Sequence, residues 1–192
     1  MKIIKTILFL FALTGAAFAQ TENLGLGAFA NQQAPIMVAL DAGLAIRQFE
    51  NPYLMFVLYM APQQHDQEIT VGRENVTLLY QGREYKMPSV KELRQNYQGQ
   101  LRDADFYRYL GKEGINASWA RFYQFFQKWD FFPSNTIDAP TAVDRGSMFG
   151  FIGFATTLYF KNPGFKKGDT FILKVKDRTN PGLTGEVEVV LE

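Results

Sequence analysis

Alternation of apolar and polar residues is the most regular pattern in the C-terminal part of the chain. Residues 170–176 place Phe171, Leu173 and Val175 on one face, and residues 186–192 alternate three apolar positions with three glutamates. This period of two is typical of β-strands that are buried on one side. The glutamates of the last strand suit the edge of a sheet, where charge discourages strand-to-strand aggregation.

Further strands follow from shorter patterns upstream. The run YLMFVLYM, residues 53–60, is apolar throughout and predicts a central strand buried on both faces. Residues 76–80 and 84–87 alternate on either side of Gln81-Gly82, which predicts a β-hairpin. Short apolar-rich runs predict additional strands at residues 36–40, 44–49 and 151–160.

Two segments between these strands show a helical pattern instead. Ser89 lies three residues before Glu92, which is a capping box and predicts a helix from about residue 90 to 98. The segment SWARFYQFFQKWDFFP, residues 118–133, is dense in aromatic rings. On a helix over 118–129 the rings share one arc of about 160° and the polar side chains share the other. We therefore expect this helix to pack its aromatic face on the sheet.

These strands, about eight or nine in number, are joined by tight turns and do not alternate with helices as βαβ units do. Their rhythm resembles that of the immunoglobulin-like domains found in bacterial exported proteins. The Cys…Trp…Cys signature of true immunoglobulin domains is absent, and the helical segments depart from the pattern. The sequence predicts a mainly β fold: an immunoglobulin-like antiparallel β-sandwich with a helical insertion at about residues 89–130.

The start of the chain has the layout of a secretory signal peptide. Residues 1–19 combine two lysines, a short apolar stretch and the cleavage signal Ala17-Phe18-Ala19. The apolar stretch is shorter than the ~20 residues that span a bilayer, so we expect cleavage before Gln20 and no membrane span afterwards. A flexible leader at residues 20–34 and a single domain at residues 35–192 are predicted to follow. The expected location is periplasmic or secreted.

Charge and residue types exclude several classes of function. Loss of the two lysines of the signal peptide leaves 18 basic against 19 acidic residues, a net charge of −1. A near-neutral surface is unsuited to nucleic acid, whose binding depends on phosphate neutralisation. The chain has no cysteine and one histidine, His65, and it carries no recognised catalytic or phosphate-binding motif. We expect no cofactor, no metal and no catalysis. The carboxylate pairs Asp103/Asp105 and Asp138/Asp144 leave a hydrolase as a weaker alternative.

Four phenylalanines are the candidate binding residues. Phe131 and Phe132 lead into the long segment 134–148, and Phe149 and Phe151 follow it. A loop of this length usually carries a function, and exposed rings grouped around it would form an interaction site. The expected partner is a protein or an envelope component, possibly a glycan.

Two alternatives remain open for these rings. They could be loop anchors inside the core, or segment 119–132 with Trp119 and Trp129 could form a carbohydrate-binding module.

Overall fold

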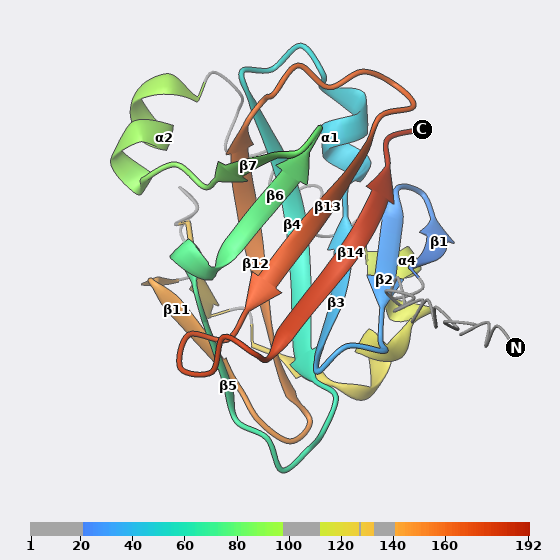
Figure 1. Ribbon diagram of the computed structural model, residues 1–192, viewed down its shortest axis with the longest axis vertical. Coiled ribbons are helices and arrows are strands. Elements are labelled where there is room, and N and C mark those ends of the chain that lie inside the picture. The colour runs from blue at the N-terminus through green and yellow to red at the C-terminus, as the bar shows by residue number, and fades with distance from the viewer. Residues whose placement is uncertain (1–20, 98–111, 127, 133–140) are drawn as a thin grey trace, which may run out of the picture.

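The computed structural model describes residues 21–97, 112–126, 128–132 and 141–192 (Figure 1). The predicted signal peptide at residues 1–19 lies outside these ranges. Strands dominate the described part of the chain and pair mostly antiparallel, which confirms the predicted mainly β class. No helix in the described ranges is both long and apolar enough to cross a membrane.

The larger sheet has six strands in the order β1-β2-β3-β4-β12-β8. The strand predicted to be central, β4, lies between β3 and β12 and is almost wholly buried. The bounds of the six strands are β1 Glu22–Gly25, β2 Ala28–Asn31, β3 Ile36–Asp41, β4 Tyr53–Pro62, β8 Gln124–Phe125 and β12 Ile152–Lys161. The β8–β12 pair is parallel, whereas the other pairs of this sheet are antiparallel.

The second sheet has four antiparallel strands in the order β14-β13-β6-β7. Their bounds are β6 Val76–Tyr80, β7 Arg83–Lys86, β13 Thr170–Lys176 and β14 Thr184–Val190. The predicted hairpin is confirmed, and its turn residues Gln81 and Gly82 both have positive φ. The charged last strand, β14, is at the edge of this sheet, as its glutamates predicted.

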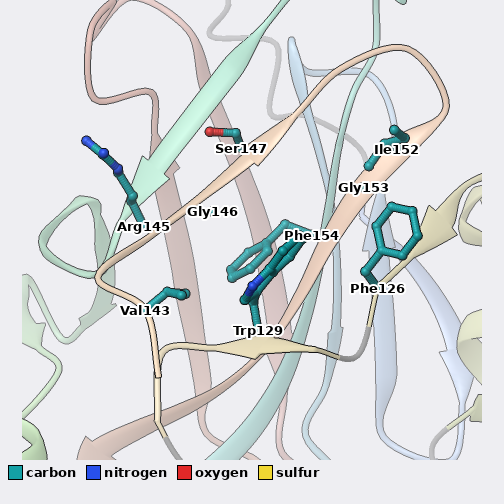
Figure 2. A pocket seen from close by; sticks show the side chains of 9 residues that line it. All are labelled: Phe126, Trp129, Val143, Arg145, Gly146, Ser147, Ile152, Gly153 and Phe154. Atoms are coloured by element: carbon teal, nitrogen blue, oxygen red, sulfur yellow. The ribbon is translucent and has the colours of Figure 1, made fainter. Parts of the chain in front are cut away.

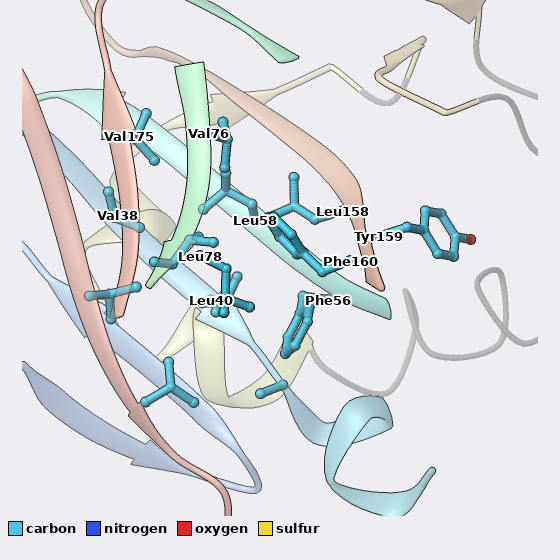
Figure 3. Close-up of a cluster of buried hydrophobic side chains, with 14 of the residues drawn as sticks. Val38, Leu40, Phe56, Leu58, Val76, Leu78, Leu158, Tyr159, Phe160 and Val175 are labelled. Carbon is cyan, nitrogen blue, oxygen red and sulfur yellow. The ribbon is translucent and has the colours of Figure 1, made fainter. Parts of the chain in front are cut away.

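The two sheets lie over one another and share a core. Figure 3 shows apolar side chains of both sheets in one cluster, with Leu58 of β4 and Leu78 of β6 among them. The rings of Phe56 and Phe171, one from each sheet, meet edge to face at 5.4 Å between centroids. Burying a large apolar side chain contributes about 1.5–3 kcal/mol, so this shared cluster accounts for the layered arrangement.

Two small sheets lie beside the main layers. In one, β11 Arg145–Met148 pairs antiparallel with β5 Ile69–Gly72, and in the other, β10 Thr141–Ala142 pairs parallel with β9 Trp129–Asp130. The strands β10 and β11 occupy the end of the segment 134–148 that was expected to be a loop. The rest of that segment, up to residue 140, lies outside the described ranges.

The helices within the described ranges are short. They are α1 Gly43–Arg47, α2 Val90–Asn96 and α4 Lys112–Asn116, with 3₁₀ turns η1 Arg73–Asn75 and η2 Trp119–Phe122. The predicted helix start at Ser89 is confirmed, because the Ser89 hydroxyl accepts a hydrogen bond from the Glu92 amide at 3.1 Å. The strand predicted for residues 44–49 is wrong. There the Asp41 carboxylate accepts a hydrogen bond from the Gly43 amide at 2.8 Å and turns the chain into α1.

The flexible leader predicted for residues 20–34 is corrected by the structure. Residues 22–31 form β1 and β2, and all four residues of β2 are buried. The glycines that indicated flexibility, Gly25 and Gly27, instead take the positive φ that a tight turn requires. The Asn31 side chain also donates a hydrogen bond to the Glu186 carbonyl at 2.7 Å, which ties this hairpin to the other layer.

The helix predicted for residues 118–129 is also wrong. Only the turn η2 is helical, and the chain then extends into β8 and β9. Trp119 is buried, in agreement with the expected core role, but Phe122, Phe126 and Trp129 are exposed. The main-chain hydrogen bonds between β8 and the edge of β12 replace those that a helix would form. The sequence of residues 118–129 does not indicate that β12 is the partner.

Candidate functional site

Exposed apolar side chains come mainly from two short segments of the described chain. Among the described residues, seven large apolar side chains are exposed, and six of them come from segments 122–129 and 149–152. We call these six the aromatic patch: Phe122, Phe126, Trp129, Phe149, Phe151 and Ile152. Isolated exposed apolar residues are ordinary on protein surfaces, whereas a contiguous group marks an interaction site. Within the six, the rings of Phe126 and Trp129 lie 6.3 Å apart between centroids, and both line one pocket with Ile152, whereas Phe151 packs on His65 and Tyr123.

Pairing of β8 with β12 brings the two segments of the patch together. Gln124 lies opposite Ile152, and its amide donates a hydrogen bond to the Phe151 carbonyl at 2.8 Å. The approach requires glycine at position 153, because a side chain there would overlap the ring of Phe125 and the carbonyl oxygen of Met60. A single glycine therefore permits the contact between segments 122–129 and 149–152.

A tight hairpin turn carries Phe149 and Phe151. Phe149 and Ile152 pair across the turn, and Gly150 has a φ of 59°, as a type II′ turn requires at its first central position. The two rings are 54% and 55% exposed. Both side chains are therefore exposed, as expected of residues that contact a partner.

His65 supports one side of this turn. Its ring centroid lies 4.0 Å from that of Phe151, and its main-chain oxygen accepts a hydrogen bond from the Gly150 amide at 3.2 Å. Its Nε2 atom lies 3.2 Å from the hydroxyl of Tyr123, and that hydroxyl donates to the Pro62 carbonyl at 2.8 Å. Burial raises the pKa of the Tyr123 phenol. The phenol is protonated at neutral pH in any case, as an unperturbed tyrosine is, and can donate this hydrogen bond. The histidine is exposed, yet it has a packing role.

A pocket of about 200 Å³ opens between β11, β12 and the segment 126–129 (Figure 2). It exists because the two strands of the hairpin diverge: β11 pairs with β5, whereas β12 pairs with β4. In the view of Figure 2, Trp129 and Phe154 are drawn at the middle of the pocket, with Phe126 and Ile152 to one side. The residues that line it are Phe126, Trp129, Val143, Arg145, Gly146, Ser147, Ile152, Gly153 and Phe154. We call this the aromatic pocket.

Polar groups lie along the β11 wall of the aromatic pocket. The Ser147 hydroxyl is 3.0 Å from the hydroxyl of Thr70, and Arg145 is exposed at the rim. Within the described residues, Arg145 makes no ion pair and no hydrogen bond. Binding pockets typically combine apolar walls with a few such polar groups, which orient the ligand.

Asp130 fixes the segment that carries Trp129. Its buried carboxylate accepts hydrogen bonds from both hydroxyls of Thr156 and Thr157, at 2.7 and 2.9 Å, and from the Thr157 amide at 2.9 Å. Arg73 holds the next residues, since its guanidinium donates to the Phe131 carbonyl at 2.6 Å and the Val143 carbonyl at 3.1 Å. Sequence reasoning missed both residues, because neither belongs to a motif and their partners are distant in the chain.

The structure separates the four predicted binding residues into two pairs. Phe149 and Phe151 belong to the aromatic patch. Phe131 and Phe132 do not, because both are buried in the main core, and Phe132 packs on Tyr159 at 5.2 Å between ring centroids. Their assignment to the site is corrected: they are the loop anchors that the sequence analysis held as the alternative. Trp129, Phe126 and Ile152 take their place.

The four carboxylates of the hydrolase alternative are only partly described by the structure. Asp103, Asp105 and Asp138 lie outside the described ranges. Asp144 is exposed, and its charge acts on the Arg73 guanidinium, where it partly opposes the lowering of the Arg73 pKa by burial. In the part of the chain that the structure describes, no three His, Asp or Glu side chains gather closely enough to hold a metal ion.

A larger cavity of about 380 Å³ lies between the β1–β2 turn and the end of the chain. It is lined in good part by glycines, and Leu26 is its one strongly exposed apolar side chain among the described residues. The aromatic pocket, with its cluster of exposed rings, is therefore the stronger candidate site. Comparison of the chain with models of protein families, with curated proteins and with solved structures gives no match.

Proposed function

We propose that the chain is an exported, non-catalytic binding protein that attaches to a partner protein through the aromatic patch. The observation that carries this proposal is that, among the described residues, six of the seven exposed large apolar side chains come from two adjoining segments. Each of these side chains that a partner buries would contribute up to roughly 1.5–3 kcal/mol of favourable free energy to binding.

The composition of the patch supports a protein partner. Cores of protein interfaces are enriched in aromatic residues and arginine and are poor in lysine and acids. The patch joins five aromatic side chains and one isoleucine to Arg145 and Arg121, and the Arg121 guanidinium lies 4.6 Å from the centroid of the Phe122 ring. Trp129 at the pocket is of the residue type that most often dominates binding energy.

Export and the fold type are parts of the same proposal. The signal-like residues 1–19 support export to the periplasm or the exterior. Two mainly antiparallel layers around one core support assignment to the immunoglobulin-like β-sandwiches, with α2 and α4 as an insertion between β7 and β8. Such a framework holds loops and hairpin tips in fixed positions, where a partner can reach them.

A capture experiment tests the binding role. The double variant Phe126→Ala/Trp129→Ala removes two rings of the patch, and Leu26→Ala removes an exposed apolar side chain at the distant cavity. Immobilised wild-type protein and the Leu26→Ala variant are expected to retain the same partner from an envelope extract, and the double variant is expected to lose it. Equal retention by a folded double variant would refute the proposal.

Exposure of Trp129 also favours a second candidate, a carbohydrate-binding module. Its indole is 48% exposed beside a hydroxyl and a guanidinium, which are the groups that bind sugar hydroxyls. Against a flat platform, Trp119 is 7% exposed, and the rings of Phe126 and Trp129 are inclined by 69°. A glycan array probed with wild-type protein and Trp129→Ala tests this candidate.

A further inference from the structure

One edge of β11 is not paired with any other described strand, and this edge adjoins the aromatic pocket. We propose that the pocket binds an extended, acidic peptide segment of the partner, which pairs with β11 at Arg145–Ser147 and inserts one large apolar side chain beside Trp129. The inference rests on the proposed protein-binding function and specifies the ligand and its mode of attachment.

The ladder between β11 and β5 determines which main-chain groups face the pocket. Ser147 lies opposite Thr70. The Thr70 carbonyl accepts a hydrogen bond from the Arg178 amide at 2.7 Å, and the Thr70 amide donates to the Asp177 carboxylate at 2.6 Å. Both main-chain groups of Thr70 therefore point away from β11, and this makes Thr70 and Ser147 a non-hydrogen-bonded pair of the antiparallel ladder.

The N–H and C=O groups of Ser147 consequently point away from β5 and toward the pocket side. Because the alternation has a period of two, those of Arg145 point the same way. The described strands leave this side of β11 open, since β5 is the partner of β11 in its sheet and pairing with β12 is limited to the Phe149–Ile152 bridge. A row of outward N–H and C=O groups is the feature to which an extended peptide adds as a further strand.

The size of the pocket suits one side chain of such a peptide. A cavity of about 150 Å³ with apolar walls accommodates a benzene ring, and the aromatic pocket measures about 200 Å³. Its walls include Trp129, Phe154 and Ile152, which present apolar surface to an entering ring or branched aliphatic side chain. Alternate side chains of a strand point to one face, so pairing along β11 would direct one residue of the ligand inward.

Charge at the rim favours acidic residues beside the inserted side chain. Arg145 lines the pocket and is exposed. Lys128, which precedes Trp129, is also exposed, and so is Arg121, whose guanidinium lies 4.6 Å from the centroid of the Phe122 ring. Arg145 makes no ion pair with an acidic residue of the described chain, and the charge of its neighbour Asp144 acts on the Arg73 guanidinium. A carboxylate of the peptide would supply the missing partner and form a charge-assisted hydrogen bond.

A phage-displayed library of random peptides, selected on the purified protein, is the probe. The selected sequences are expected to share one aromatic or branched aliphatic residue with aspartate or glutamate nearby. In a complex with the synthetic consensus peptide, amide hydrogen exchange at Ser147 is expected to slow relative to the free protein. Selection on Arg145→Glu is expected to enrich lysine or arginine in place of the acids.

Two substitutions at one position isolate the main-chain contact. Ser147→Pro removes the N–H that faces the pocket but leaves the pairing of Gly146 and Met148 with β5 available. Ser147→Ala removes only the hydroxyl. The proline variant is expected to bind the consensus peptide about tenfold more weakly than the alanine variant, which is the effect of one lost hydrogen bond. Should the proline variant fail to fold, the exchange measurement on the wild-type protein decides the question.

The possible results separate the inference from the proposed function. If Trp129→Ala weakens peptide binding while Ser147→Pro and Ser147→Ala bind equally and Ser147 exchange does not slow, strand pairing is overturned and the binding site stands. If the selected peptides bind Trp129→Ala as tightly as wild type, both proposals are overturned. If no peptide is enriched but a glycan binds in a Trp129-dependent manner, the peptide inference and the protein partner are overturned, and the carbohydrate-binding candidate takes their place.

Discussion

Asp130 and Thr157 are joined by two hydrogen bonds, one from the Thr157 amide and one from its hydroxyl, each at 2.9 Å. The pair connects the segment of Trp129 to β12, and both side chains are buried. Removing a buried acceptor that has several donors leaves each of those donors without a hydrogen bond, and each unpaired buried donor lowers stability. The position of one wall of the aromatic pocket thus depends on a polar contact inside the core.

We predict that Asp130→Ala lowers the free energy of unfolding by about 3–4 kcal/mol, since at least two buried donors lose their acceptor. Asp130→Asn keeps one carbonyl oxygen and should cost less, about 1–2 kcal/mol. Asp66→Ala, at an exposed loop position, is the control and should stay within about 0.5 kcal/mol of wild type. Urea unfolding measures all three, and equal stability of Asp130→Ala and wild type would contradict the role of this contact.

Gly153→Ala should separate the two halves of the aromatic patch. The added methyl group overlaps the Phe125 ring and the Met60 carbonyl oxygen, so we expect β8 to move away from β12 and stability to fall by about 1–3 kcal/mol. Gly182→Ala is the matched control, because its new methyl group would approach only the end of the Asn180 side chain, at 3.2 Å. A crystal structure of Gly153→Ala with β8 in place would contradict the expectation.

Stability should fall in acid partly through Asp177. Burial raises the pKa of its carboxyl, but hydrogen bonds from Thr70, Thr179 and Asn180 lower it by more, so the net pKa lies below its ordinary value. A lowered pKa in the folded state means that the stabilisation is complete above the unfolded value of about 3.9. It is lost as the pH falls through the folded pKa.

The variant Asp177→Asn removes this dependence. At neutral pH we expect it to be less stable than wild type by about 1–3 kcal/mol, and the difference should shrink as the pH is lowered below about 4. Thermal or urea unfolding of both proteins at a series of pH values measures the difference. A constant difference across the acid range would show that Asp177 contributes no pH-dependent stability.

The two tryptophans should differ in their access to solvent. Trp119 is 7% exposed and Trp129 is 48% exposed. In single-tryptophan proteins, acrylamide should quench the fluorescence of Trp129 in Trp119→Phe several-fold more strongly than that of Trp119 in Trp129→Phe. Addition of a ligand of the aromatic pocket should protect Trp129 alone. Similar quenching of both would place Trp129 in the core.

Export can be tested by mass. Cleavage before Gln20 should remove residues 1–19 from the protein recovered outside the bacterial cytoplasm, and mass spectrometry of its N-terminal peptide measures this directly. Replacing Ala17 and Ala19 by a bulkier residue removes the small side chains that signal peptidase requires and should leave the longer form. Recovery of the uncut wild-type chain from the cytoplasm alone would contradict the expected location.

The strands with regular alternation could be predicted from sequence, because burial on one face imposes a period of two on the residues themselves. That holds for β13, β14 and the β6–β7 hairpin, and the apolar run of β4 likewise indicated a central strand. The capping box at Ser89 acts within one turn of helix, so it too could be predicted. In each case the interaction that fixes the structure is contained in the segment or repeated along it.

The candidate site could not be predicted in the same way, because it depends on contacts between distant segments. On a helix, the rings of residues 118–129 would separate well from the polar side chains. In the structure, however, β8 is held by hydrogen bonds to β12, where Gln124 pairs with Ile152, about 28 residues later in the chain. Gly25 and Gly27, at the turn between β1 and β2, suggested flexibility. The sequence does not distinguish a glycine that forms a tight turn from one in a flexible segment. Exposure of Phe149 and burial of Phe131 likewise follow from the pairing of whole strands.

The divergence of β11 and β12 has a mechanical consequence. Because the walls of the aromatic pocket belong to strands of different sheets, a ligand seated there would contact both sheets, in addition to the core that they already share through Val71, Met148 and Phe154. Its binding energy would resist any change in their separation, so the bound protein should unfold at a higher temperature. A pulling force applied through the partner would act on both sheets at once and would not separate the β11–β12 hairpin from one sheet alone.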